Sequence, residues 1–149
     1  MKITVLNKNK FNSLMNNLDI TSNNVCNKKD FYFISINDLE GEMSTSYFEK
    51  DSPNVLKLYF DDTVDDNKSM TVDQGKQIIE FLKKINPTDR TNLIIHCTAG
   101  QNRSGSVGKF AADFFNYGYN KFVSENPFIK GNSTVTRILN RLHLWNHFE

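Results

Sequence analysis

The chain has little of several features that mark particular protein classes. It contains only 2 cysteines in 149 residues, too few for the disulfide framework of a small secreted domain. No apolar run approaches the ~20 residues that a membrane-spanning helix needs, and the first residues lack the apolar segment of a secretory signal. The formal net charge is only +1, so no excess of basic residues favours nucleic acid or a membrane surface. We therefore expect a cytoplasmic protein without a membrane partner.

The remaining composition is that of an ordinary globular domain. Hydrophobic residues make up 38% of the chain and charged residues 23%, both within the usual range. A chain of 149 residues is long enough to bury a core of its own and short enough to be one domain. It has no internal repeat and no evident linker. We expect residues 1–149 to form a single domain.

Apolar periodicity divides the chain into alternating strands and helices. Thr71 and Gln74 have the spacing of a capping box, which marks the start of one helix. The last helix is expected to turn Val135, Ile138, Leu139, Leu142 and Trp145 inward. The alternation predicts a three-layer α/β fold with a mostly parallel sheet of four to five strands between helices. The expected strands are 1–6, 31–36, 55–60 and 93–96, and the expected helices lie near 11–18, 71–85, 104–117 and 133 onward.

The most informative stretch is residues 96–105, His-Cys-Thr-Ala-Gly-Gln-Asn-Arg-Ser-Gly. It follows a buried apolar run, and five residues separate its cysteine from its arginine. This spacing suits a loop that leaves a strand, wraps around a tetrahedral anion and enters a helix. Backbone N–H groups in such a loop, backed by a helix N-terminus, bind phosphate. The groups expected to do so belong to Thr98, Ala99, Gly100, Gln101, Asn102 and Arg103.

The side chains of this stretch fit the same purpose. Arg103 has a planar fork that can hold two phosphate oxygens at once. The positive field of the loop would also stabilise a thiolate at Cys97, the form of cysteine that attacks. Gly100 gives the backbone conformations that a side chain would disfavour. One loop would thus trap the anion and activate the nucleophile.

Through His96, Cys97, Gly100, Arg103 and Ser104 the sequence resembles the cysteine-based protein tyrosine phosphatases, and it is most similar to the small dual-specificity branch. The resemblance implies the fold of that superfamily and hydrolysis of phosphate monoesters through a cysteinyl-phosphate intermediate. It implies no cofactor and no metal. The expected partner is a phosphorylated protein or a small phosphate ester, and nucleic acid is not expected.

The resemblance also assigns roles outside the loop. In this family a general acid follows the strand that here spans 55–60, upstream of the helix that precedes the loop, which favours Asp62, with Asp61 second and Asp65 and Asp66 behind. Ser104 would steady the departing thiolate, and it could also cap the helix. His96 would hold the loop by hydrogen bonding without touching substrate.

Two other functions stay open. RNA 5′-triphosphatases of the same superfamily share Thr98 and Asn102, but they carry histidine where this chain has Ala99. A non-catalytic module could use Arg103 and the loop to hold phosphoprotein without turnover. No metal site is predicted, because the histidines at 96, 143 and 147 lack partners at metal-ligand spacing.

Overall fold

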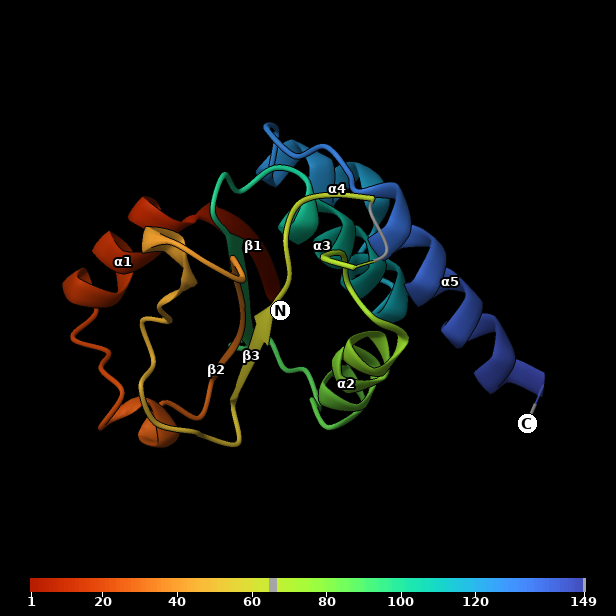
Figure 1. The fold of residues 1–149 in the computed structure, drawn as a ribbon. Coiled ribbons are helices and arrows are strands. Elements are labelled where there is room, and N and C mark those ends of the chain that lie inside the picture. The colour runs from red at the N-terminus through yellow and green to blue at the C-terminus, as the bar shows by residue number, and fades with distance from the viewer. Residues whose placement is uncertain (65–66, 149) are drawn as a thin grey trace.

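Four parallel strands form one sheet at the centre of the molecule (Figure 1). The computed structural model describes residues 1–64 and 67–148. The strands lie in the order β1-β4-β2-β3, and each neighbouring pair runs parallel. This confirms the expected α/β class with a sheet of four strands. The strands are β1 (Lys2–Asn7), β2 (Phe31–Asn37), β3 (Val55–Tyr59) and β4 (Asn92–Cys97).

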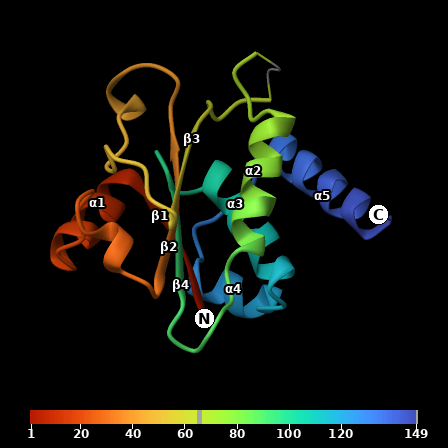
Figure 2. The ribbon, with the colours of Figure 1, turned by 90° about the horizontal axis from the view of Figure 1, so that it is seen from below.

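Helices cover both faces of the sheet and complete the three layers (Figure 2). One face carries α1 (Lys8–Asn17), and the other carries α2 (Val72–Lys83), α3 (Arg103–Phe114) and α5 (Ser133–Phe148). A short helix, α4 (Tyr119–Glu125), follows α3. No helix in the described part of the chain is long and apolar enough to cross a membrane. Two 3₁₀ turns, Val25–Asn27 and Glu42–Ser44, lie in the loops on either side of β2.

The two faces of the sheet bury separate hydrophobic clusters. Along β2, Phe33 joins the cluster under α1, whereas Ile34 and Ile36 join the larger cluster under α2, α3 and α5. In β4, Ile94 faces α1, and its neighbours on both sides face the larger cluster. This alternation follows from the two-residue period of a strand. A continuous apolar run is therefore required in each central strand.

The parallel sheet places the carboxyl ends of all strands at one edge. β4 lies inside the sheet, between β1 and β2, and ends at Cys97. The next helix, α3, begins at Arg103. The loops that follow β2 and β3 leave the same edge. Side chains far apart in the sequence can therefore meet around Cys97, as is usual for ligand sites in open parallel sheets.

Two helical details tested the sequence predictions. The capping box is confirmed: Gln74 N donates to Thr71 Oγ1 over 3.1 Å, and Thr71 N donates to Gln74 Oε1 over 2.9 Å. The inward placement of Trp145 was wrong, because its side chain is 68% exposed. The end of α5 extends past the helices that cover its first turns (Figure 1), so no neighbouring element buries that position. Helix α4 was not predicted.

The cluster under α1 depends on Phe11. This ring is fully buried and lies 6.0 Å from Phe33 and 5.8 Å from Phe48 between centroids. Phe11→Ala should lower the free energy of unfolding by about 3–5 kcal/mol, since it leaves a cavity in a packed core. Urea denaturation measures this value. Leu144→Ala is the control, because Leu144 is exposed and its loss should cost no more than about 0.5 kcal/mol; equal losses would contradict the described packing.

Candidate active site

The loop between β4 and α3 curls around the sulfur of Cys97. Cys97 is buried, and Gly100 N donates to its Sγ over 3.2 Å. Ser104 Oγ, in the first turn of α3, lies 3.0 Å from the same Sγ. Two groups thus approach the sulfur with hydrogen-bonding geometry. Together these contacts fix the position of the sulfur at the base of the loop.

Gly100 fits the loop closely against the end of β1. Its φ is +70°, in the left-handed region that favours glycine. A Cβ at this position would lie 2.4 Å from Asn7 N and 2.6 Å from the carbonyl carbon of Leu6. A side chain therefore has neither the backbone conformation nor the space it needs. The shape of the loop depends on this glycine and on the neighbouring strand.

Arg103 lies almost completely buried, at 4% exposure, beside this loop. Its Nη1 donates to Phe60 O over 2.7 Å and forms an ion pair with Asp38 Oδ1 at 2.8 Å. Its Nε is buried and has no hydrogen-bond partner within the described residues. A buried donor without a partner costs free energy and calls for an explanation. A bound oxyanion, held by one edge of the guanidinium, would supply the missing acceptor.

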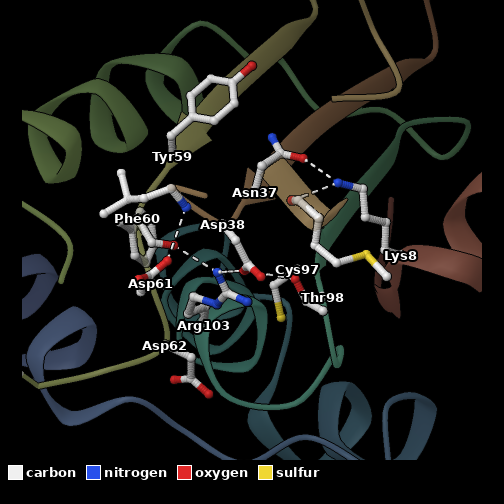
Figure 3. A network of polar contacts seen from close by, with 12 residues as sticks. Lys8, Asn37, Asp38, Tyr59, Phe60, Asp61, Asp62, Cys97, Thr98 and Arg103 are labelled. Carbon is white, nitrogen blue, oxygen red and sulfur yellow. Dashed lines mark hydrogen bonds and ion pairs between the residues drawn. The ribbon is translucent and has the colours of Figure 1, made fainter. Parts of the chain in front are cut away.

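Asp38 is a site residue that the sequence analysis missed. It directly follows β2, and its Oδ1 accepts hydrogen bonds from Thr98 Oγ1 (2.9 Å) and from Arg103 Nη1 (Figure 3). One carboxylate thus binds both the loop between β4 and α3 and the guanidinium of Arg103. The sequence did contain a signal for it: Asp38 is the first residue after a buried strand that pairs with β4, so both lie at the same edge of the sheet.

Beneath Asp38 lies a buried lysine, which no sequence pattern indicated. Lys8 is 6% exposed, and its Nζ donates to Asn37 Oδ1, Met43 O and Thr45 O over 3.1, 2.9 and 2.7 Å. All three ammonium donors are therefore satisfied. Burial lowers the pKa of Lys8, although the charge of Asp38 partly opposes this effect. These bonds fix the loop after β2, and with it the position of Asp38.

The predicted general acid, Asp62, lies at the rim of the loop. Its Oδ2 accepts a hydrogen bond from Asn102 Nδ2 (2.7 Å), and its Oδ1 accepts one from Asn132 Nδ2 (3.0 Å). The Asn102 side chain thus binds the acid-bearing loop. Asn132 is a further residue that sequence analysis did not assign to the site. It is buried and also donates to Thr63 O, so it connects the start of α5 to the segment of Asp62.

Asp61 has a different environment. Its Oδ1 accepts a hydrogen bond from Leu39 N over 3.0 Å, which links the loops after β2 and β3. Both Asp61 and Asp62 line a cavity of about 340 Å³ together with Arg103. The remaining lining residues are Asp38, Glu40, Thr98 and Ala99. The two weaker candidates for the acid, Asp65 and Asp66, lie outside the described residues.

His96 lies below the loop, away from this cavity. It is fully buried, its Nε2 is 2.7 Å from Ser35 Oγ, and its ring stacks on Phe11 with centroids 4.2 Å apart. Burial lowers its pKa from 6.5 to about 3, and the charges of Lys8 and Arg103 act in the same direction. His96 is therefore neutral at neutral pH, and its contacts are structural.

No group of three or more His, Cys, Asp or Glu side chains suited to a metal ion occurs among residues 1–64 and 67–148. Arg103 is the cation that lines the cavity. Backbone N–H groups such as that of Gly100, together with a guanidinium, can hold a tetrahedral anion over the sulfur of Cys97.

Comparison with known proteins adds little to this geometry. No family model and no curated protein matches the sequence. Five chains of solved structures match. One is the crystal structure of PTPMT1 in complex with PI(5)P, which is 15% identical to this chain and has a TM-score of 0.49. The match covers 95% of this chain and 90% of that one. A likeness at this level carries no argument about activity.

The buried histidine should make stability depend on pH. Because the folded state resists protonation of His96 while the unfolded chain takes up a proton near pH 6.5, stability should fall as the pH drops from 6.5 towards 3. The contribution of this group is about 1.4 kcal/mol per pH unit. Urea denaturation at several pH values across that window measures the free energy of unfolding. Its decrease with falling pH should be smaller for His96→Gln than for the wild type. Parallel slopes would show that the unfolded and folded states bind the same number of protons at this residue.

Proposed function

We propose that this chain is a cysteine-dependent phosphatase that hydrolyses phosphate monoesters, with phosphotyrosine first among its substrates and phosphoserine and phosphothreonine as further ones. The observation that carries the proposal is that Cys97 and Arg103, the two ends of one loop, lie close together (Figure 3). The sulfur is held by Gly100 N and Ser104 Oγ, and the buried Nε of the guanidinium has no hydrogen-bond partner in the part of the chain that the structure describes. These are the groups that a phosphate monoester needs: a nucleophile below the phosphorus and donors around its oxygens.

The first step transfers the phosphoryl group to sulfur. The Cys97 thiolate attacks phosphorus in line, so that an S–P bond forms while the P–O bond to the leaving group breaks. Arg103 and the amides of residues 98–103 hold the equatorial oxygens, whose charge they offset. Asp62, acting as general acid, gives its proton to the departing oxygen. Its place between Asn102 and Asn132, at the mouth of the loop, supports that role.

The second step releases phosphate. The ionised Asp62 accepts a proton from water, and the water oxygen attacks phosphorus as the S–P bond breaks. The electron pair of that bond returns to Cys97 as a thiolate. Ser104 Oγ, 3.0 Å from the sulfur, donates a hydrogen bond to it as the thiolate leaves. Asp38 acts through Arg103, since its carboxylate holds Nη1 and so turns the other edge of the guanidinium towards the phosphate.

The nucleophile is tested with p-nitrophenyl phosphate, in the presence of reductant and without added metal. Wild-type protein should turn it over, and Cys97→Ser should abolish turnover, because a serine hydroxyl is a far weaker nucleophile than a thiolate. Cys26→Ser is the matched control: this second cysteine is exposed, and it precedes β2 at the opposite edge of the sheet. Activity that survives Cys97→Ser would refute the mechanism. A folded wild type without turnover would favour the phosphate-binding module.

The general acid is tested by comparing two leaving groups. Asp62→Asn should slow hydrolysis of an alkyl phosphate by about 10²–10⁴-fold, since an alkoxide must be protonated as it leaves. The loss should be much smaller with p-nitrophenyl phosphate, whose leaving group departs without a proton. Asp61→Asn is the matched comparison, because it makes the same change one residue earlier. If Asp61→Asn showed a larger difference than Asp62→Asn between its rate losses on the alkyl phosphate and on p-nitrophenyl phosphate, Asp61 would be the general acid.

A further inference from the structure

The cavity over the loop between β4 and α3 has a buried guanidinium at its floor and carboxylates at its rim. Its lining contains four carboxylates but only one cationic side chain, Arg103. One of the four, Asp38, is neutralised by its ion pair with that arginine. The other three are Glu40, Asp61 and Asp62. The groups that hold a phosphate thus lie beneath a ring of negative charge.

The rim carboxylates differ in how they are bonded. Asp62 accepts from two side-chain amides, and Asp61 accepts from the backbone of Leu39. Glu40 is exposed, and its carboxylate makes no hydrogen bond or ion pair within the described part of the chain. None of these contacts supplies a positive charge. Apart from the acid Asp62, the rim therefore presents two uncompensated carboxylates to whatever surrounds the bound phosphate.

Three lysines close to this cavity contribute no side chain to its lining. Lys8 is buried and uses its three donors on the loop after β2. Lys130 reaches the phosphate loop through its backbone N–H, which donates to Gln101 O. Lys68 accepts from Asp61 N through its carbonyl and is exposed. None of the three belongs to the lining of the cavity.

We propose that the substrates of this site are phosphorylated peptide segments in which lysine or arginine flanks the phosphorylated residue. The inference rests on the proposed phosphatase function. Arg103 Nε, which is buried and has no partner among the described residues, selects the phosphate, while Glu40 and Asp61 select the residues beside it. A substrate with additional phosphates near the reacting one, such as a phosphoinositide headgroup or a 5′-triphosphate end, brings like charge to the rim and is disfavoured.

The test compares phosphotyrosyl peptides of equal length that differ only in the residues flanking the phosphotyrosine: lysine, alanine or glutamate. The ratio of kcat/KM between the lysine and alanine peptides should be about three- to tenfold, as expected for two exposed charge pairs. The glutamate peptide should be the slowest of the three. The preference should shrink with added salt, because exposed pairs are screened over about 10 Å at 0.1 M.

Variants of the rim locate the source of the preference. Glu40→Gln should reduce the lysine-to-alanine ratio, and Glu40→Lys should abolish or invert it. Asp89→Lys makes the same charge change as the second variant in the turn before β4, at the opposite edge of the sheet, and should retain the wild-type ratio. Because the readout is a ratio within each protein, a general change in activity cancels.

Several results would overturn the inference. Equal kcat/KM for the three peptides would show that the rim carboxylates do not select the flanking residues. The same would follow if Glu40→Lys kept the wild-type ratio of kcat/KM between the lysine and alanine peptides. Faster turnover of a short-chain phosphoinositide or of RNA with a 5′-triphosphate would assign the site to a polyanion. Hydrolysis of p-nitrophenyl phosphate without any peptide preference would refute this inference alone. Absence of that hydrolysis would refute the proposed function itself.

Discussion

A buried guanidinium sets the arrangement of the site. A charge removed from water is tolerated only where it is paired and hydrogen-bonded, and Arg103 meets this requirement with groups from two other loops. Phe60 O comes from the end of β3, and Asp38 comes from the end of β2. The ends of β2, β3 and β4 are thereby drawn to one point. The Nε donor has no hydrogen-bond partner among residues 1–64 and 67–148, so it stays free to bind an anion.

Three buried or half-buried charges alternate in sign at this site: the cation Lys8, the anion Asp38 and the cation Arg103. Lys8 lies under the loop that carries Asp38, and Asp38 lies between the two cations (Figure 3). A protonated histidine nearby would add a third positive charge to this arrangement. His96 avoids that by remaining neutral, because burial and both cations lower its pKa to about 3. His96 thus adds no charge of its own to the groups around Lys8 and Arg103 at neutral pH.

The sequence predicted those features that depend on short-range spacing. The loop from Cys97 to Arg103, the capping box at Thr71 and the strand pattern all follow from residues close together along the chain. Asp38 and Lys8 could not be assigned in this way, since their roles come from contacts made between separate loops and helices. Trp145 failed for a related reason: its position matches the apolar period of α5, but the neighbouring helices end before it. The four-strand sheet lies at the lower end of the expected range.

The register of the sheet has a consequence for how the molecule folds. β1 pairs with β4, and the partners Lys2 and Asn92 are 90 residues apart along the chain. Gly100, in turn, packs against the last residue of β1. During synthesis at about 5–20 residues per second, β1 must wait on the order of 5–20 s before its partner strand has been made. The loop between β4 and α3 thus depends on a contact that joins distant parts of the chain, and such contacts slow folding. Of the four strands, β1 comes first in the chain, yet it completes its pairing only after the last of them has been made.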